Sequence, residues 1–357
     1  MKKKILITTG GSGGHVVPAL NFYKHLNQYN DVFLTSDLRG LRFIDKKIYN
    51  YKIIDVPDIK KNLLKIPLNL LFFFISIIKS LFYLRKNKID KIISTGGYMT
   101  FPICIASLFT KSELFLFEPN MVLGRSNLFF LRVCKKVFCY SNSVRKFPQK
   151  YTSKIKLIYP VLNKKSYLSK NNLKKTSDQK IFLVIGGSQG AQFFQTDLKD
   201  AINKLSKKFN LSIYHQTNKE NFKDLEIFYQ KNNISFKLFD FEPNLEKIFV
   251  KTDFCITRAG ASTLAELVFF KVPLLAIPFP YSKDDHQLFN AKYYKDKNCC
   301  WLIEQNELEK KDLFEIISNI LDDKKNLKLK KKAMNELSSE NTWENNNQII
   351  TKILYEN

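Results

Sequence analysis

Two glycine-rich segments occupy places where a strand is expected to end and a helix to begin. Residues 10–14 read Gly-Gly-Ser-Gly-Gly after the apolar run 5–7, and residues 186–190 read Gly-Gly-Ser-Gln-Gly after the apolar run 182–185. A turn of this kind exposes backbone N–H groups at the positive end of the helix dipole, and glycine has no Cβ to keep an anion at a distance. Both loops therefore predict phosphate binding, with a purely structural turn as the alternative.

His15 follows the first loop directly and is a candidate general base. An imidazole with an ordinary pKa of about 6.5 can accept a proton from an attacking hydroxyl group that lies within about 3 Å. The alternative is a histidine that caps the helix or packs on the sheet. The glycine-rich surroundings favour the catalytic interpretation.

A second polar segment, residues 257–266, follows an expected strand and begins a helix. Its small residues admit a ligand to the helix N-terminus, where Ser262 and Thr263 can donate hydrogen bonds to phosphate. Glu266, about one turn later, can accept two hydrogen bonds from a ribose diol. The alternative for Glu266 is an acid that balances the helix dipole.

Gln287 and Asn290 lie three residues apart on an expected helix and therefore share one of its faces. Amide side chains at this spacing suit the hydroxyl groups of a sugar. A solvated helix face is the usual setting of such a pair, and the residues alone leave both interpretations open.

Other nucleotide-binding and metal-binding patterns are missing from the sequence. Neither loop has the G-x-G-x-x-G spacing of a dinucleotide site, but Asp37 follows the second expected strand where a ribose-binding acid would stand, so a nicotinamide-dependent enzyme remains an alternative. No G-x-x-x-x-G-K-S/T sequence occurs, which argues against a P-loop nucleotidase. The six cysteines form no C-x-x-C pair and no Cys/His cluster at zinc spacing, so we expect reduced thiols and neither a metal site nor a disulfide framework.

Two parallel sheets are needed to position these residues. Short apolar, β-branched runs alternate with longer stretches whose apolar residues recur every three or four positions, which predicts parallel strands covered by helices. The glycine-rich motif occurs once in each half of the 357 residues, and this echo predicts two similar doubly wound domains. The expected strands are 4–9, 31–36, 51–56, 90–95, 113–118, 136–141, 180–185, 211–217, 236–241, 254–258 and 274–278, and the expected helices are 16–29, 122–133, 190–207, 260–270, 286–297 and 342–356.

The chain is long enough for two domains of ordinary size. We expect an N-terminal domain over residues 1–162 and a C-terminal domain over residues 181–340. The Lys-, Asn- and Ser-rich stretch 163–180 is typical of a linker. A last helix within residues 341–357 carries an apolar face that can pack back on the N-terminal domain.

The net charge is unusual. Fifty-eight Lys and Arg residues against 33 Asp and Glu give +25. This excess favours a polyanionic partner, which would be nucleic acid, a phosphorylated substrate or an anionic membrane. A biased codon pool, visible as abundant Lys, Asn, Ile and Phe throughout, is the alternative explanation.

Residues 63–84 are the most apolar stretch, and cations flank it on both sides. Its longest charge-free run, residues 68–78, would span about 16 Å as a helix, against a hydrocarbon core of about 30 Å. We therefore expect no uninterrupted membrane-spanning helix. Two interpretations remain, a buried core helix with solvated ends and an apolar segment in the lipid headgroup region. The flanking cations are Lys60, Lys61, Lys65, Lys79, Arg85, Lys86, Lys88 and Lys91.

Taken together, the motifs resemble those of the MurG family, bacterial UDP-N-acetylglucosamine transferases of glycosyltransferase family 28 that complete lipid II. They occur in the family's order over nearly the whole chain, and jointly they are highly specific. The matching residues are Gly10-Gly11-Ser12-Gly13-Gly14-His15 with Pro18 and Ala19, Gly96-Gly97-Tyr98 with Pro102, Glu118 and Asn120 with Gly124 and Asn127, the segments 186–191 and 258–266, and Gln287 with Asn290 and Ala291.

The resemblance implies a GT-B fold, an α/β architecture of two doubly wound parallel-sheet Rossmann-like domains facing a cleft. It implies inverting transfer of GlcNAc from UDP-GlcNAc to the muramoyl hydroxyl group of undecaprenyl-diphospho-muramoyl-pentapeptide (lipid I), which forms lipid II for peptidoglycan. The enzyme would act peripherally on the cytoplasmic face of the bacterial plasma membrane, on an anionic surface, with no nucleic acid and no cofactor. A GT-B enzyme that glycosylates another lipid, such as diacylglycerol, is the alternative.

The resemblance also implies roles for individual residues. His15 is the first candidate for the base and Glu118 the second. With no Asp-x-Asp pair to hold a divalent cation, we expect no obligatory metal, and helix N-termini and hydroxyl groups would stabilise the departing UDP. The donor would bind through Ser188, Gln189, Glu242, Arg258, Ala261, Ser262, Thr263, Leu264, Ala265, Glu266, Gln287 and Asn290, and the acceptor with its diphosphate through Ser12, Gly13, Gly14, Tyr98, Asn120 and Asn127.

Some positions depart from the family pattern. Phe117 and Pro119 flank Glu118 where the family commonly has His and Gln, and Leu162 stands where it commonly has Arg. The missing Arg removes a cation that the resemblance would place near the donor. Ser12 in place of the commoner Thr is conservative.

Overall fold

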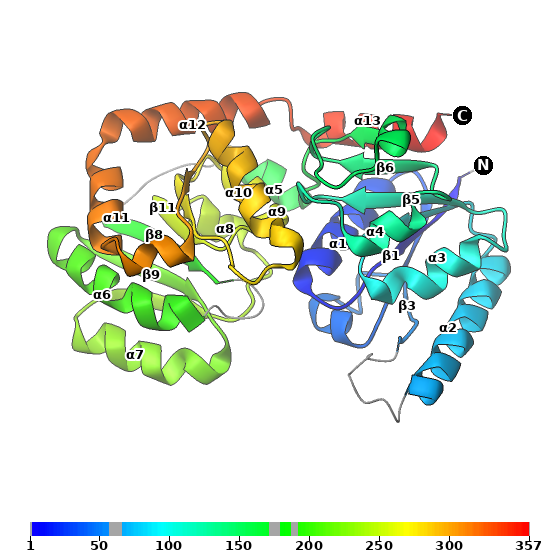
Figure 1. The fold of residues 1–357 in the computed structure, drawn as a ribbon, viewed down its shortest axis with the longest axis horizontal. Helices are drawn as coiled ribbons and strands as arrows, with labels where there is room; N and C mark the ends of the chain where they lie inside the picture. Colours follow the sequence, from blue (N-terminus) through cyan, green and yellow to red (C-terminus); the bar gives the residue numbers. More distant parts are fainter. Residues whose placement is uncertain (1, 57–65, 171–178, 187–191, 357) are drawn as a thin grey trace. The chain divides into compact units, whose positions relative to one another are not determined.

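The structure, a computed structural model of the chain, describes residues 2–56, 66–170, 179–186 and 192–356 (Figure 1). It contains two compact units. Unit 1 consists of Met1–Lys164 together with Trp343–Asn357, and unit 2 consists of Lys165–Thr342. The boundaries expected at 162 and 340 lie close to this division, whereas part of the expected linker forms a short helix, α5 (Lys164–Ser169).

Unit 1 contains a seven-stranded parallel sheet with the order β3-β2-β1-β4-β5-β6-β7. β1 pairs with β2 on one side and with β4 on the other, so the direction in which strands are added reverses at β1. At such a switch point the loops after the two central strands diverge and leave room for a ligand. The strands are β1 (Lys4–Thr8), β2 (Asp31–Ser36), β3 (Tyr51–Ile53), β4 (Lys91–Ser94), β5 (Glu113–Glu118), β6 (Lys136–Cys139) and β7 (Ile155–Leu157).

Both faces of this sheet are buried, which explains why its central strands are apolar without alternation. Ile5 and Ile7 belong to one core cluster and Leu6 to another, because successive side chains of a strand point to opposite faces. The helices of unit 1 are α1 (Gly13–Leu26), α2 (Ile66–Asn87), α3 (Phe101–Ser107), α4 (Arg125–Phe130) and α13 (Trp343–Tyr355), with 3₁₀ helices η1 (Arg39–Phe43), η3 (Tyr98–Thr100) and η4 (Gln149–Lys154).

Unit 2 repeats this plan in a six-stranded parallel sheet with the order β10-β9-β8-β11-β12-β13. Its switch point lies between β8 and β11, which correspond to β1 and β4. The prediction of two doubly wound domains is therefore confirmed. The strands are β8 (Lys180–Ile185), β9 (Leu211–Gln216), β10 (Ser235–Phe239), β11 (Phe254–Thr257), β12 (Leu274–Ala276) and β13 (Trp301–Leu302).

The helices of unit 2 enclose a core of their own, built on the apolar faces of α6 and α11. Phe194, Leu198 and Ile202 recur at helical spacing on α6 and are almost fully buried. The helices are α6 (Gln192–Lys208), α7 (Phe222–Lys231), α8 (Glu246–Phe249), α9 (Ala261–Phe269), α10 (His286–Asp296), α11 (Leu313–Asp322) and α12 (Lys324–Ser338), with 3₁₀ helices η5 (Lys219–Asn221), η6 (Lys283–Asp285) and η7 (Gln305–Glu309).

The C-terminal helix α13 packs back on unit 1 and completes one of its cores. Ile350 is buried there together with Phe22 of α1. The ring of His25 stacks on Trp343 with 3.8 Å between centroids, and its Nε2 lies 3.1 Å from the carbonyl oxygen of Leu162. Burial lowers the pKa of His25 to about 4, so the ring is neutral at pH 7.

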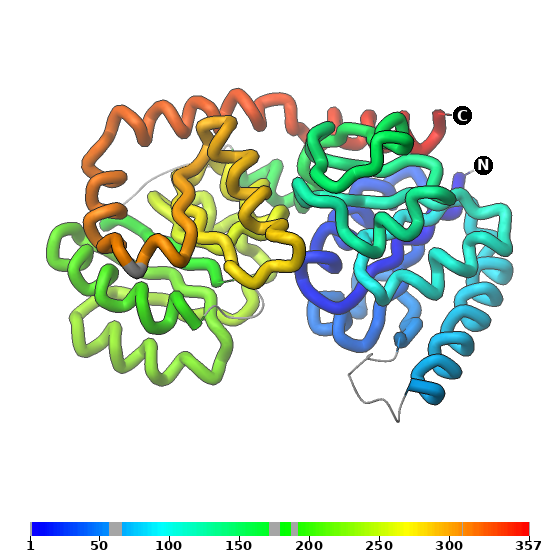
Figure 2. The backbone as a smooth tube through the Cα atoms, viewed as in Figure 1, coloured from blue at the N-terminus to red at the C-terminus, as the bar shows by residue number. Residues whose placement is uncertain are grey.

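Helix α2 differs from the core helix that was one of the two expectations for residues 63–84. Its buried residues are Ser76, Ser80 and Leu84, whereas most of its large apolar side chains are exposed. The helix runs along α3 at the margin of unit 1 (Figures 1 and 2). Its length and composition would suffice to cross a membrane. The core interpretation is therefore wrong for the described part of this segment, residues 66–84.

Replacing Ile350 by Ala should lower the free energy of unfolding by about 2–5 kcal/mol, because a fully buried side chain is removed and a cavity is left. Ile349, its neighbour on α13, is only partly buried, so Ile349→Ala is a matched control with a smaller loss. Urea unfolding followed by circular dichroism measures both. Equal losses would contradict the described packing of α13.

Candidate functional site

The first candidate site lies at the switch point of unit 1, where the loops after β1 and β4 meet. Thr95 Oγ1 donates to Thr9 Oγ1 over 2.8 Å and joins the two loops. Gly11 has φ +74°, and a Cβ there would lie 2.8 Å from Met99 Cε. A larger residue would be strained at this φ and would displace the end of the Met99 side chain, so glycine suits the position where the loops close on each other.

The N-terminus of α1 offers backbone donors at this edge. Ser12 is the N-cap, and its carbonyl accepts from the N–H groups of His15 and Val16. The N–H groups of Gly13 and Gly14 have no hydrogen-bond partner among the described residues, and a Cβ on Gly14 would meet only Ser12 Oγ, at 3.7 Å. This geometry can hold an anion, as the glycine-rich sequence predicts.

His15 is oriented by the second loop. Its Nδ1 lies 2.8 Å from the carbonyl oxygen of Thr95. A carbonyl oxygen only accepts, so Nδ1 carries the proton and Nε2 presents its lone pair. A Cβ on Gly97, which has φ +82°, would lie 3.4 Å from Nε2, so glycine keeps the approach to that nitrogen clear. The side chain is partly exposed and is arranged as a general base requires.

Glu118, the second candidate for the base, is placed differently. It is 2% exposed, and both of its oxygens accept hydrogen bonds. The donors are the N–H of Gly124 at 2.7 Å, Asn127 Nδ2 at 2.9 Å, Asn120 Nδ2 at 3.0 Å and the N–H of Asn120 at 3.2 Å. The carboxylate therefore ties together the segment between β5 and α4 and does not present a lone pair to a substrate, so its expected role as a base is not supported.

The two asparagines of this segment are partners of Glu118 as well. Asn127 is 3% exposed, and its Nδ2 donates also to the carbonyl of Phe117 at 3.0 Å. The side-chain amide nitrogen of Asn120 donates to Glu118. Both residues thus position the loop, and the expectation that Asn120 and Asn127 bind the acceptor stays a prediction. The polar groups that remain available to a ligand at this edge include the backbone N–H groups at the start of α1.

Asp37, the acid that a nicotinamide enzyme would use to bind ribose, is likewise hydrogen-bonded within the protein. It is fully buried and accepts from the N–H of Gly11 at 2.7 Å, from the N–H of Gly40 at 3.0 Å and from Arg39 Nε at 2.7 Å. The carboxylate clamps the glycine-rich loop against η1, so the nicotinamide alternative loses its key residue.

Arg39 is a residue that the sequence patterns did not single out. Held by Asp37, it reaches across to the hydroxyl group of Tyr98 and to Met99 Sδ. Its guanidinium group therefore stands beside Tyr98, one of the expected acceptor-binding residues. The only sequence signal was an arginine two residues after the acid that follows β2.

The second candidate site lies at the N-terminus of α9 in unit 2. Gly260 is the N-cap, and no side chain caps the helix. The N–H groups of residues 261–263 have no partner among the described residues, and the side chains of Ser262 and Thr263 are partly exposed. Ala261, Leu264 and Ala265 are buried, so of these residues only Ser262 and Thr263 offer a side chain as well as backbone. Ser188 and Gln189 lie outside the described residues.

Gln287 and Asn290 hold the two loops of this site together. Gln287 Oε1 accepts from the N–H of Ala259 at 3.1 Å and from the N–H of Phe279 at 3.0 Å. Its Nε2 has no partner among the described residues and can donate to a ligand. Asn290 is 1% exposed, and its Nδ2 donates to the carbonyl of Ala259 at 3.1 Å. Asn290 therefore positions the loop at Ala259, and its expected contact with the sugar stays a prediction.

Arg258 was expected to bind the donor, but its fork is bonded to the protein. It is 6% exposed and donates to the carbonyls of Ile277 and Pro278 and to Gln305 Oε1. Burial lowers its pKa to about 10, so it stays charged at pH 7. No described carboxylate pairs with it, and it is packed among the rings of Phe193, Phe194 and Phe279. Arg258 would therefore attract an anion through its positive charge and not through a direct hydrogen bond.

Two glutamates stand at the same edge of unit 2. Glu242 follows β10, accepts from the N–H of Asn244 at 3.0 Å and lies 3.6 Å from Lys237 Nζ. Glu266 lies in the second turn of α9. Burial raises the pKa of Glu266 to about 8, and the carboxyl group of Glu246, itself 5% exposed, adds to this rise. A ribose diol would supply the hydrogen bonds that this carboxyl lacks in the described structure.

The raised pKa of Glu266 should make unit 2 less stable as the pH rises. Below pH 4.5 the group is protonated in both states. Between pH 4.5 and 8 it ionises in the unfolded chain but not in the folded one, so stability falls by about 4 kcal/mol over this window. Glu266→Gln should lose that part of the pH dependence. Urea unfolding at pH 5 and pH 8 measures it, with exposed Glu336→Gln as the control, and identical pH profiles for wild type and Glu266→Gln would refute the shift.

The family model described as Glycosyltransferase family 28 N-terminal domain matches residues 5–139, and that described as Glycosyltransferase family 28 C-terminal domain matches residues 181–345. A relative from Pelagibacter ubique, named UDP-N-acetylglucosamine–N-acetylmuramyl-(pentapeptide) pyrophosphoryl-undecaprenol N-acetylglucosamine transferase, is 50% identical over 357 residues, 100% of both chains.

A relative of the same name from Rickettsia felis is 31% identical and covers 90% of this chain and 92% of its own. The crystal structure of MurG from Acinetobacter baumannii superposes with a TM-score of 0.73 at 22% identity, covering 99% of this chain and 100% of that one, and shows that the fold is GT-B. Both family models match in order, and the first relative matches from end to end. The chain therefore belongs to glycosyltransferase family 28.

Proposed function

We propose that this protein transfers GlcNAc from UDP-GlcNAc to the muramoyl hydroxyl group of undecaprenyl-diphospho-muramoyl-pentapeptide and so forms lipid II. The observation that carries the proposal is the 50% identity, over the full length of both chains, to a relative named for this transfer. The two candidate sites support it, because each unit presents an uncapped helix N-terminus at the switch point of a parallel sheet. A donor diphosphate and an acceptor diphosphate need two such sites.

Unit 2 would bind UDP-GlcNAc. The free N–H groups at the start of α9 with the hydroxyls of Ser262 and Thr263 suit the diphosphate, and the buried charge of Arg258 would raise the local positive potential without touching it. Glu266 would accept from the ribose diol, and Gln287 Nε2 would donate to the sugar. The segment at Glu242 would face uracil, and Ser188 and Gln189 would complete the donor site.

Unit 1 would bind the lipid-linked acceptor at the residue 12–14 loop and supply the base. In the proposed step the muramoyl hydroxyl oxygen attacks the anomeric carbon of GlcNAc, the bond from that carbon to the UDP oxygen breaks, and the configuration inverts to β1→4. His15 Nε2 takes the hydroxyl proton. The helix dipole and N–H groups of α9 stabilise the charge that develops on UDP, so no metal or cofactor is required.

The exposed apolar face of α2 would dock the enzyme on an anionic membrane surface, where the lipid-linked acceptor resides. Ser76 Oγ donates to the carbonyl of Asp55 at 2.7 Å, so one side of α2 is attached to unit 1 and only the other side is offered to lipid. A helix held in this way is suited to lie in the headgroup region of the cytoplasmic face. An exposed apolar helix has no use in nucleic acid binding, which would need interleaved Arg and aromatic residues.

His15→Gln should lower kcat by about 10²–10⁴-fold, because glutamine cannot accept the hydroxyl proton. The dissociation constant for UDP should change little, since the donor elements belong to the other unit. Steady-state kinetics and calorimetric titration with UDP measure the two quantities. A variant with near-normal kcat would assign the base to another residue.

The acceptor can be tested with labelled UDP-GlcNAc, a short-chain lipid I analogue and diacylglycerol, each offered in vesicles to the purified protein. We expect label in the lipid I product alone. The same rate in EDTA is expected, and full loss restored by magnesium would contradict a metal-independent reaction. Label in the diacylglycerol product alone would overturn the proposed acceptor while leaving the transferase class intact.

A further inference from the structure

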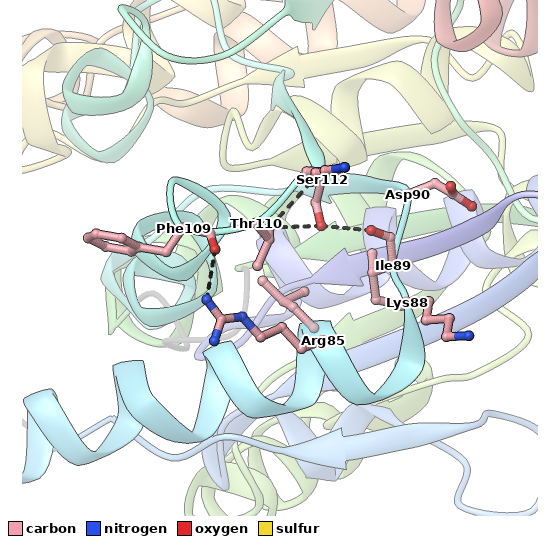
Figure 3. A pocket seen from close by; sticks show the side chains of 9 residues that line it. Arg85, Lys88, Ile89, Asp90, Phe109, Thr110 and Ser112 are labelled. Carbon is pink, nitrogen blue, oxygen red and sulfur yellow. Dashed lines mark hydrogen bonds between the residues drawn. The ribbon is translucent and has the colours of Figure 1, made fainter.

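Unit 1 contains a pocket at the edge of its sheet away from the first candidate site. The pocket has a volume of about 600 Å³ and lies at the amino ends of β4 and β5, where Arg85 donates to the carbonyl of Phe109 at 3.3 Å (Figure 3). The proposed chemistry instead needs groups at the carboxyl edge of the sheet. Arg39 lies at that edge, and the function proposed above gives it no role.

Arg39 joins two loops at the carboxyl edge of the unit 1 sheet. The strand order β2-β1-β4 places the glycine-rich loop after β1 between the loops after β2 and β4. Arg39 lies in η1, in the loop after β2, and its Nη2 donates to the hydroxyl group of Tyr98, in the loop after β4. The guanidinium group therefore bridges the two loops that flank the glycine-rich loop.

The residues that Arg39 connects also enclose the glycine-rich loop. A Cβ on Gly10 would lie 2.6 Å from Asp37 Oδ1 and 2.9 Å from Met99 Cγ, so the backbone passes closely between these two side chains. Arg39 Nε donates to Asp37 Oδ2 at 2.7 Å, and Arg39 Nη2 lies 3.0 Å from Met99 Sδ. Asp37, Arg39 and Met99 thus form a continuous series of contacts around the loop that precedes α1.

Arg39 is held in place although it is partly exposed. Its side chain is 43% exposed, whereas that of Asp37, its ion-pair partner, is fully buried. Asp37 is itself fixed by the N–H groups of Gly11 and Gly40. Because the guanidinium group is planar, a bond from Nε to a fixed carboxylate also sets the direction of its other N–H groups.

The bond from Arg39 decides what the hydroxyl group of Tyr98 can do. A guanidinium group only donates, so the phenol oxygen accepts from Arg39 and the phenol hydrogen points to another group. A cation bonded to this oxygen polarises the O–H bond and makes it a stronger hydrogen-bond donor. Arg39 Cζ also lies 5.2 Å from the centroid of the Tyr98 ring. Such a donor suits an anionic oxygen better than a neutral one.

The loop that carries Tyr98 adjoins the loop that can hold an anion. Met99, the next residue, packs against Gly11, and His15 Nδ1 contacts the carbonyl of Thr95 in the same loop after β4. Tyr98 is partly exposed. A diphosphate bound at the N–H groups that begin α1 would therefore lie at the same edge of the sheet as the Tyr98 hydroxyl group.

We propose that Arg39 is a positioning residue that holds the Tyr98 hydroxyl group as a hydrogen-bond donor to a diphosphate oxygen of the acceptor. The proposal rests on the transfer and the acceptor proposed above, and it adds a residue to the acceptor site. Because Arg39 acts through Tyr98 in the acceptor-binding unit, its replacement weakens acceptor binding and leaves binding of UDP-GlcNAc unchanged.

The test compares conservative variants at two arginines of η1. Arg39→Lys keeps a positive charge for Asp37, but a single ammonium group lacks the fork that bonds to Asp37 and Tyr98 together. Arg42 stacks on Phe43, with 4.5 Å from Cζ to the ring centroid, and no described contact joins it to Tyr98, so Arg42→Lys is the control. Arg39→Lys should raise KM for a short-chain lipid I analogue about tenfold, with KM for UDP-GlcNAc unchanged, whereas Arg42→Lys should change neither.

Tyr98→Phe removes the hydroxyl group alone and completes a double-mutant cycle. If Arg39 acts through this hydroxyl group, Arg39→Lys should raise the acceptor KM by no more than about twofold in the Tyr98→Phe background. Independent effects of the two substitutions would overturn the proposal. So would equal rises of both KM values in Arg39→Lys, or the same kinetics in Arg39→Lys and Arg42→Lys.

A spectroscopic measurement separates this proposal from the transfer reaction. In protein with ¹³C-labelled tyrosine, the Cζ resonance of Tyr98, assigned with Tyr98→Phe, reports on bonds to its hydroxyl group. Arg39→Lys should move this resonance and Arg42→Lys should not. Inorganic pyrophosphate should shift it in the wild type at a lower concentration than in Arg39→Lys.

The outcomes of this measurement are distinct from those of the kinetics. No response of the Tyr98 resonance to pyrophosphate, or the same response in wild type and Arg39→Lys, would overturn the proposal. If the wild type fails to glycosylate the lipid I analogue while the resonance responds as expected, the transfer is refuted and the contact of Tyr98 with a diphosphate stands.

Discussion

The rest of this structure depends on one constraint. Several buried charged side chains make their hydrogen bonds with the backbone of loops. Asp37 holds Gly11, Glu118 holds Gly124, and Arg258 holds the carbonyls after β12. A buried ion costs several kcal/mol unless it is hydrogen-bonded or paired, so each of these loops is held in an arrangement that gives its ion hydrogen-bond partners. The fold thereby fixes the segments that follow the central strands, and the backbone donors at α1 and α9 are left pointing outward.

This constraint explains why few side chains need to meet the substrates. A catalytic group is effective when it is held before the reaction begins, since nothing then has to reorganise in the transition state. His15 has one ring nitrogen fixed by the Thr95 carbonyl and the other kept clear by Gly97. Gln287 Oε1 is held by two backbone N–H groups, and these bonds also fix the orientation of the side-chain NH2 group. Neighbouring residues hold each side chain in place, and in the proposed reaction one atom of each, His15 Nε2 and Gln287 Nε2, would contact the substrates.

The sequence predicted the strands, the glycine-rich loops and the repeat of two sheets, because these follow from local patterns of apolar residues and from glycine's lack of a side chain. It missed β7 and β13, which have three and two residues and so no readable period. It did not predict which polar residues face inward. Glu118 and Asn290 have the chemistry of ligands, but Glu118 is turned inward by the loop that follows it, and Asn290 by Ala259, 31 residues earlier in the chain. The outward apolar face of α2 was also ambiguous, although Ser76 and Ser80 at helical spacing mark its attached side.

The net charge of +25 can now be divided between two physical tasks. Backbone N–H groups act over short distances and in fixed directions, so they suit a diphosphate held for reaction and need no net charge. Side-chain ammonium and guanidinium groups act over a Debye length of about 8–10 Å and tolerate motion, so they suit a membrane surface. The loops of unit 1 that would hold a diphosphate are accordingly built from glycine and serine, whereas Arg85, Lys86 and Lys88 crowd the end of an exposed apolar helix. A chain that used lysines for both tasks would hold its substrate loosely, because a flexible cation cannot position the oxygen that must leave.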